Sequence, residues 1–226
     1  MARRTKEDAM ATRHKLLDSA ESLFQAQGVS RTSLQDIARR AGATRGAIYW
    51  HFKDKADLFN AMMERVTLPL EAAFDLPAGR HQNPGSEGAD PLFRIRQATT
   101  NALTRIVHDE QTRRVLEVAT QMVEYVKELE AVRLRHLSVR QEFVARFEQS
   151  IDTAARRARL DLPMPAALAA RGFHALIDGL IQNWLLDQQA FDLLEVGQQA
   201  MNVYLQGLGF SITPAEDTRA VRATDD

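Results

Sequence analysis

Apolar residues recur with the period of an α-helix along almost the whole chain. Leu16, Leu17, Ala20, Leu23 and Phe24 follow the spacing i, i+1, i+4, i+7 and i+8, which places them on one helical face. No segment shows the sustained alternation of a strand. The pattern predicts an all-α protein of about nine helices. The 226 residues can form one large domain, or a small domain and a larger one.

Turn residues divide the first part of the chain into short helices. Ser33 and Asp36 form a capping-box pattern that predicts a helix start, and Gly42 breaks that helix. Thr44 is placed to cap a third helix that ends at about His51. Short helices joined by a tight turn with glycine are typical of a helix-turn-helix, whose second helix enters the DNA major groove.

Four ring residues, YWHF, stand in a row in the third predicted helix. A helix buries one stripe, so the rings cannot all face inward. We expect Ile48 and Phe52 to face the core, which leaves Tyr49 and His51 facing outward, where both can donate to phosphates. Trp50 can pack on the DNA backbone or against the first helix.

Several small and basic residues beside these rings suit contact with DNA. The Arg45 guanidinium fits the guanine edge, and Gly46 allows close approach at roughly 1 kcal/mol of helix propensity. Lys55 is expected at the start of a fourth helix, where backbone N–H groups already favour a phosphate. The Ser33 and Thr44 hydroxyls can act in the same way at their helix starts.

Charge and composition narrow the function classes. Residues 1–60 hold eleven Lys and Arg against seven Asp and Glu, whereas the remainder holds 18 against 23, which suggests an anion-binding head on an acidic body. The absence of cysteine excludes disulfides, thiolate metal sites and cysteine nucleophiles. No catalytic or phosphate-loop motif occurs, so we expect neither an enzyme nor a cofactor nor a metal. No apolar run approaches the roughly 18 residues of a membrane helix, so no membrane partner and a cytoplasmic location are expected.

Proline and glycine mark the remaining boundaries. The segment 77–91 is expected to be a loop, and Pro69 should kink the fourth helix or end it early. Further helices are expected at about 92–108, 111–117, 118–159, 166–187 and 190–208. The predicted division is an HTH DNA-binding domain at 1–54, a ligand-binding and dimerisation domain at 55–210 and a disordered tail at 211–226.

The segment from Thr12 to Leu58 resembles the DNA-binding head of TetR-family transcriptional regulators. The motifs are A-x-x-L-F-x-x-x-G at 20–28, T-S-L-x-D-I-A at 32–38, A-G-x-T-R-G-A-I-Y-W-H-F at 41–52 and K-x-x-L at 55–58. R-G-A-I-Y-W-H-F, the R-R-T-K-E start and, more weakly, D-G-L-I-x-x-W-L-L at 178–186 resemble the AcrR-like branch, whose members repress multidrug efflux pump genes. The resemblance implies base-proximal positions for Arg45, Gly46 and Ala47, and phosphate contacts for Thr44, Tyr49, His51 and Lys55.

A single HTH covers half of a DNA site, so a homodimer that spans two half-sites about 34 Å apart is expected. The predicted helix 166–187 is apolar nearly all round, which indicates burial on both sides. The alternative is that this helix and the last one form an ordinary core pair. The candidate interface comprises Gly172, Ala175, Gly179, Trp184, Met201, Tyr204, Leu205 and Leu208.

The same helix is expected to border a ligand cavity. His174 and Asp178, at i and i+4, are polar residues in an apolar helix, as in cavities with a few placed polar groups. A buried Asp needs a partner, either Arg96 or a cationic ligand, and the resemblance implies that this Asp borders the drug pocket. The candidate wall, for which plain core is the alternative at each position, comprises Leu70, Phe74, Phe93, Arg96, Thr100, Leu103, Met122, Tyr125, Phe143, Phe147, His174, Ile177 and Asp178.

Together these features predict a ligand-responsive repressor. Its partners would be double-stranded operator DNA, a second copy of the chain and a hydrophobic small-molecule inducer. Hydrophobic drugs would release it from a palindromic operator. Such release requires the cavity to be coupled to the head. The alternatives are an activator, a TetR-type regulator of catabolic or lipid genes, and a helical small-molecule carrier without a role on DNA.

Overall fold

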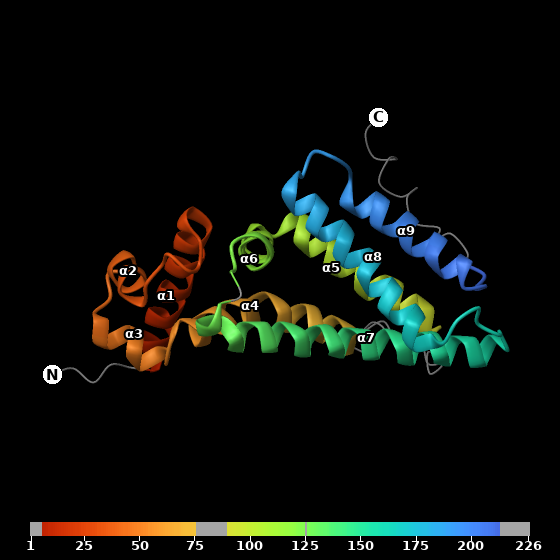
Figure 1. The fold of residues 1–226 in the computed structure, drawn as a ribbon, viewed down its shortest axis with the longest axis horizontal. Coiled ribbons are helices and arrows are strands. Elements are labelled where there is room, and N and C mark those ends of the chain that lie inside the picture. Colours follow the sequence, from red (N-terminus) through yellow and green to blue (C-terminus); the bar gives the residue numbers. More distant parts are fainter. Residues whose placement is uncertain (1–5, 76–89, 125, 213–226) are drawn as a thin grey trace, which may run out of the picture.

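The computed structural model describes residues 6–75, 90–124 and 126–212, without the side chains of 69–75. The described residues form helices and no strand, as predicted (Figure 1). One short 3-10 helix, η2, spans Lys127–Leu129. The α-helices are α1 (Lys6–Gln27), α2 (Leu34–Arg40), α3 (Arg45–His51), α4 (Lys55–Asp75), α5 (Pro91–His108), α6 (Glu110–Gln121), α7 (Glu130–Ala158), α8 (Ala166–Leu186) and α9 (Leu193–Gly207).

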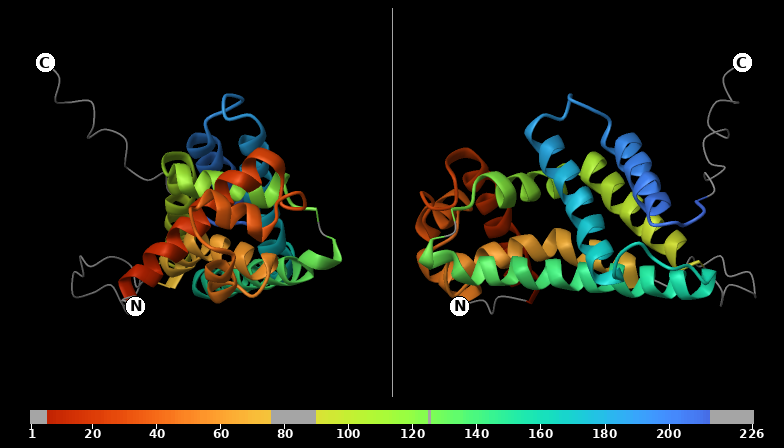
Figure 2. Two further views of the ribbon diagram at one scale, coloured as in Figure 1. Left: turned by 90° about the vertical axis from the view of Figure 1, so that its left-hand side faces the viewer. Right: turned by 45° about the vertical axis from the view of Figure 1, so that its right-hand side comes forward.

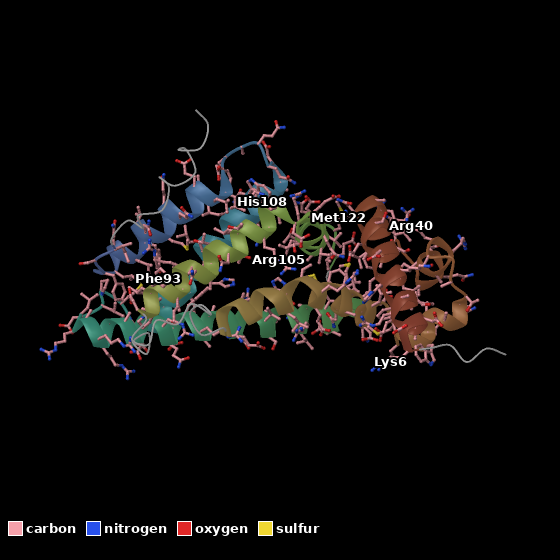
Figure 3. The ribbon with its side chains drawn as sticks, turned by 180° about the vertical axis from the view of Figure 1, so that it is seen from behind. Lys6, Arg40, Phe93, Arg105, His108 and Met122 are labelled. Carbon is pink, nitrogen blue, oxygen red and sulfur yellow. The ribbon has the colours of Figure 1, made fainter. Side chains whose placement is uncertain are left out.

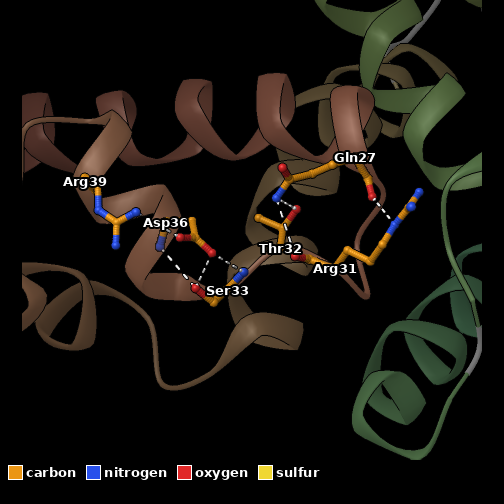
Figure 4. Close-up of polar contacts among 6 residues, drawn as sticks. All are labelled: Gln27, Arg31, Thr32, Ser33, Asp36 and Arg39. Atoms are coloured by element: carbon orange, nitrogen blue, oxygen red, sulfur yellow. Dashed lines mark hydrogen bonds and ion pairs between the residues drawn. The ribbon is translucent and has the colours of Figure 1, made fainter.

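Helices α1, α2 and α3 form a head whose short helices begin at the predicted caps. The Ser33 side chain accepts from the Asp36 amide, and the Asp36 carboxylate accepts from the Ser33 amide, so the capping box is complete (Figure 4). Thr44 caps α3 by accepting from the Ala47 amide. Gly42 lies between the two helices at φ +65°, a left-handed conformation that favours glycine.

The body has two layers of helices (Figures 1 and 2). Helices α4 and α7 lie side by side along one edge, and α5, α8 and α9 cross above them. Helix α6 lies between the head and this upper layer and contacts α1, α4 and α8. The head is therefore attached through α4 and α6 together.

Two hydrophobic clusters form the core. One joins α5, α7, α8 and α9. The other fills the head and continues into the body through Val115, Val118, Leu129 and Val132. The expected boundary after residue 54 lies within this cluster, because Ile37 and Phe59 belong to the same buried set.

The predicted long helix 118–159 is wrong at its start. Helix α6 ends at Gln121, and α7 begins at Glu130. The carbonyl of Met122 accepts from the Val29 amide of the head at 3.2 Å, and the Met122 side chain packs against the head cluster. Figure 3 shows Met122 where the head meets the body. Contacts with the head thus replace the helical hydrogen bonds expected here.

Helix α4 does not end at Pro69 but continues to Asp75. A proline removes one hydrogen bond within a helix, and tertiary contacts often outweigh this cost. The predicted loop at 77–91 and the predicted tail at 211–226 lie almost entirely outside the described residues.

Candidate nucleic-acid interface and body cavity

Helix α3 presents two of its rings to solvent. Ile48 and Phe52 are buried in the head, as predicted, whereas Tyr49 and Trp50 are 50% and 72% exposed. The Arg45 guanidinium lies 5.8 Å from the centre of the Tyr49 ring. The outer face of α3 therefore combines a cation with aromatic surface, a pairing that suits phosphates and base edges.

Other predicted DNA contacts also lie on the head surface. Thr44 and Gly46 are exposed, and Ala47 and His51 are half-buried. Ser33 is exposed, but its hydroxyl donates to the Asp36 carboxylate at 2.5 Å. This hydrogen bond lowers the pKa of Asp36 and keeps the carboxylate ionised. The Ser33 hydroxyl proton is therefore used within the capping box and is not available to a phosphate.

Lys55 differs from its predicted role, because its side chain is buried. Its amine donates to the Ser30 carbonyl at 3.3 Å and lies 3.5 Å from the Glu128 carboxylate. The amine thus joins the head to the segment before α7 and is not offered to a phosphate. Lys53, two residues earlier, is exposed and supplies a surface cation in its place.

The body contains a cavity of ≈ 210 Å³. Its walls are mainly apolar, with aromatic rings from Phe59, Phe143 and Phe147. Helix α4 contributes Phe59, Asn60, Met63 and Thr67; α5 contributes Thr99, Ala102 and Ile106; α6 contributes Leu116, Ala119 and Thr120; α7 contributes Val132, Arg135, His136, Val139, Arg140, Phe143 and Phe147; and α8 contributes His174, Ile177, Asp178, Ile181 and Gln182.

Two polar groups of this wall are buried without a hydrogen-bond partner among the described residues. They are the Asn60 side-chain oxygen and the Thr99 hydroxyl. An unsatisfied buried polar atom costs about 1–3 kcal/mol. Such atoms in a cavity wall indicate a place for the polar atom of a bound molecule or for water.

The cavity includes only part of the predicted wall. Phe143, Phe147, His174, Ile177 and Asp178 line it. The Asp178 carboxylate accepts from Gln182 at 2.5 Å, and among the described residues it forms no ion pair with Arg96. Burial lowers the pKa of His174, which keeps its imidazole neutral at pH 7.

The other predicted wall residues lie elsewhere. Leu103 is buried against α9, and Met122 packs on the head cluster. Phe93 is 48% exposed at the end of α5 far from the head (Figure 3). Arg96 and Thr100 also do not line the cavity. Leu70, Phe74 and Tyr125 have side chains outside the described residues.

Sequence reasoning missed most of the wall contributed by α7. Val132, His136, Val139, Phe143 and Phe147 are spaced by three or four residues, the period of one helical face. This stripe is legible in the sequence. Its mixture of apolar and basic residues is also typical of a solvated helix face.

Half of the predicted dimer interface is buried within the protomer. Trp184, Met201, Leu205 and Leu208 belong to the body core, so their side chains are not available to a partner. Tyr204 donates to the Ala169 carbonyl at 2.8 Å, and a Cβ at Gly172 would overlap its hydroxyl. These two residues therefore make a contact between α8 and α9 of one chain.

A different stripe of α8 and α9 faces outward. Leu168, Leu186 and Val203 are 56%, 71% and 68% exposed. Ala175 is exposed on the same face of α8, and Gly179 has open space where a Cβ would lie. Of the predicted interface residues, Ala175 and Gly179 therefore lie on this outer stripe.

Polar contacts tie α1 to both α4 and α6. The Arg65 guanidinium on α4 lies 2.7 Å from Asp18 and 2.9 Å from Glu21 on α1. Gln111 on α6 donates to Glu21 at 3.1 Å, and Gln25 donates to Glu117 at 3.0 Å. Burial raises the pKa of Glu21, although the contacts with Gln111 and Arg65 oppose this shift.

Two family models match the chain. Residues 16–62 match the model described as bacterial regulatory proteins of the tetR family, and residues 90–210 match the C-terminal region of the MAATS-type transcriptional repressor. In the described part of the chain, no helix has the length and apolar character needed to cross a membrane.

Curated relatives and solved structures agree with these matches. The HTH-type transcriptional regulator AcrR of Shigella flexneri is 36% identical over 213 residues, which cover 91% of this chain and 93% of that protein. TtgR of Pseudomonas putida is 36% identical, with 86% and 90% covered. The structure of NalD, the secondary repressor of the MexAB-OprM multidrug efflux pump in Pseudomonas aeruginosa, has a TM-score of 0.79 at 37% identity and covers 90% of this chain and 98% of its own.

Proposed function

The chain belongs to the TetR family of bacterial regulatory proteins, and we propose that it represses a multidrug efflux operon until a ligand binds its cavity. Similarity to NalD and to SmeT, the repressor of the Stenotrophomonas maltophilia multidrug efflux pump SmeDEF, supports an efflux operon as the target. A TetR-family protein is a transcriptional regulator and not an enzyme. The match of its head to the family model also speaks against a carrier without a role on DNA.

The shared walls of the cavity carry this proposal. Helix α4 lines the cavity with Asn60 and Met63, and two residues further along it holds α1 through Arg65. Helix α6 lines the cavity with Leu116 and holds α1 through Glu117. Both helices that attach the head are therefore cavity walls, and a molecule that displaces either of them changes the position of the head.

Operator binding would use the outer face of α3. Arg45 would read a guanine edge, Gly46 and Ala47 would lie close to the bases, and Thr44 and Tyr49 would contact phosphates. Two copies would bind half-sites about 34 Å apart. The outward stripe of α8 and α9, with its exposed leucines and Val203, is the proposed dimer surface.

Ligand binding would act by changing the spacing of the two heads. A coupling free energy of about 1–3 kcal/mol lowers operator affinity by about 5–150-fold. Such a change is sufficient to release a repressor from its site. A protein that acts on operator DNA in a bacterium works in the cytoplasm, which is the proposed location.

The test is fluorescence anisotropy with a labelled fragment from upstream of the gene itself or of a divergent neighbour. Arg45→Ala should weaken specific binding by about 1–3 kcal/mol, and a hydrophobic drug should release the wild-type protein. Arg133→Ala is the matched control, because Arg133 is an exposed arginine of α7 that pairs with Glu130 and does not line the cavity. Absence of specific binding would refute the repressor, and binding that no drug reverses would refute the efflux assignment.

A further inference from the structure

The charged groups around the cavity are mainly basic. Among the described side chains, Arg135 and Arg140 on α7 line it against a single carboxylate, Asp178 on α8. Arg135 is already 3.9 Å from Glu64, and Asp178 already accepts a hydrogen bond from Gln182. Arg140 forms no ion pair with any described side chain, and it is an exposed residue of the cavity lining.

His174 shares this basic wall. Burial lowers the pKa of its imidazole, and Arg140 and His136 lower it further, whereas Asp178 opposes them. A neutral imidazole offers one N–H donor without adding a second charge. A ligand anion at this wall would therefore meet the Arg140 guanidinium and a neutral donor, whereas a ligand cation would be repelled by Arg140 and would find Asp178 already hydrogen-bonded to Gln182.

The walls formed by α4 and α5 carry buried polar atoms that need hydrogen-bond partners. The Asn60 oxygen and the Thr99 hydroxyl are buried and have no hydrogen-bond partner in the part of the chain that the structure describes, and Thr99 is 2% exposed. An amide oxygen requires a donor, and a hydroxyl can accept or donate. A ligand hydroxyl satisfies both. The cavity wall also offers the rings of Phe59, Phe143 and Phe147.

We propose that the cavity selects small aromatic carboxylic acids that also carry a ring hydroxyl, in preference to lipophilic cations. The carboxylate would lie at Arg140 and His174, the hydroxyl at Asn60 and Thr99, and the rings between them. The volume of ≈ 210 Å³ favours a ligand smaller than those of typical drug sites, which run to about 300–1,000 Å³. This inference rests on the proposed function, because it takes the cavity to be the inducer site.

Calorimetric titration of the full-length protein at neutral pH tests the proposal with three probes on one ring system. They are 6-hydroxy-2-naphthoate, 2-naphthoate and 2-naphthylmethylammonium. We expect the hydroxy acid to bind most tightly, the plain acid about tenfold more weakly because it leaves the buried oxygens unpaired, and the cation most weakly. Equal or tighter binding of the cation, or no binding of either acid, would overturn the proposal.

Variants identify the groups responsible. Arg140→Gln should weaken both acids by about tenfold, whereas Arg133→Gln, the same change outside the cavity, should leave them unaffected. Thr99→Val should reduce, but not abolish, the advantage of the hydroxy acid over the plain acid, because the Asn60 oxygen can still accept from the ligand hydroxyl. Equal effects of the two arginine changes would refute the role of Arg140, and an advantage that Thr99→Val leaves unchanged would refute the placement of the hydroxyl at Thr99.

Operator release, measured in parallel, separates this inference from the proposed function. If acids bind the cavity but leave operator affinity unchanged, the ligand class holds and the repressor mechanism fails. If only cationic drugs bind and release the operator, the mechanism holds and the ligand class is wrong.

Discussion

Replacing Gly46 by alanine should stabilise the head and weaken operator binding at the same time. A Cβ at Gly46 would have Thr44 Oγ1 as its nearest neighbour, at 3.9 Å, an ordinary contact. Gly46 lies in the first turn of a seven-residue helix. Because alanine is favoured over glycine in a helix, we expect the free energy of unfolding to rise by about 0.5–1 kcal/mol.

Operator affinity should change in the opposite direction. The added methyl group would occupy the face of α3 that lies against the DNA, where extra volume in a packed interface costs about 1–3 kcal/mol. The expected loss is therefore about tenfold, or about 1.4 kcal/mol. Urea unfolding measures the first effect, and anisotropy with the operator fragment measures the second.

Gly42→Ala is the matched control within the same motif. A Cβ at Gly42 would also meet open space, but its φ of +65° is strained for alanine. We expect a loss of about 1–2 kcal/mol in unfolding free energy, in contrast to the gain at Gly46. A destabilised Gly46→Ala protein would refute the estimate of space around α3. Unchanged operator affinity would refute the close approach of α3 to DNA.

Three further predictions concern the junctions of the fold. Gly172→Ala should lower the unfolding free energy by about 1–3 kcal/mol, because its Cβ would displace the Tyr204 hydroxyl. Adding Tyr204→Phe should restore part of this loss. Additive effects of the two changes in urea unfolding would contradict the overlap of the Cβ with the hydroxyl. Burial raises the pKa of Glu21, so the folded state holds this proton more tightly than the unfolded chain, and stability should fall as pH rises through the raised pKa. Glu21→Gln should remove this slope from unfolding free energies measured as pH rises above the ordinary glutamate pKa of about 4.3, and an unchanged slope would refute the assignment. Lys53→Ala should reduce the salt dependence of operator binding by about one counterion. Lys55→Ala should leave the salt dependence unchanged, because its amine is buried. If both variants reduce the slope of operator affinity against salt concentration equally, Lys55 also contacts the DNA.

Local signals predicted the head well. The caps at Ser33 and Thr44 are confirmed because each depends on a side chain and a backbone amide only three residues away. The inward direction of Ile48 and Phe52 follows from helical periodicity in the same way. Short-range chemistry of this kind is fully contained in the sequence.

The errors arose where distant segments decide the structure. The end of α6 depends on a hydrogen bond between Met122 and Val29, which are far apart in the chain. The burial of Lys55 depends on Ser30 and Glu128 in the same way. Helix α8 is apolar on several faces, so its pattern could not separate the core residue Trp184 from the outward-facing Leu168.

The continuous cluster beneath the head restricts how this protein can be re-engineered. A chimaeric sensor made by joining a foreign DNA-binding segment to residue 55 would pair Phe59, Val115 and Val118 with side chains for which they were not selected. The mismatch would create voids or overlaps at the graft. A transplant that also carries α4, α6 and the segment up to Val132 would keep the packing between head and body. It would also keep the two helices that line the cavity and contact the head.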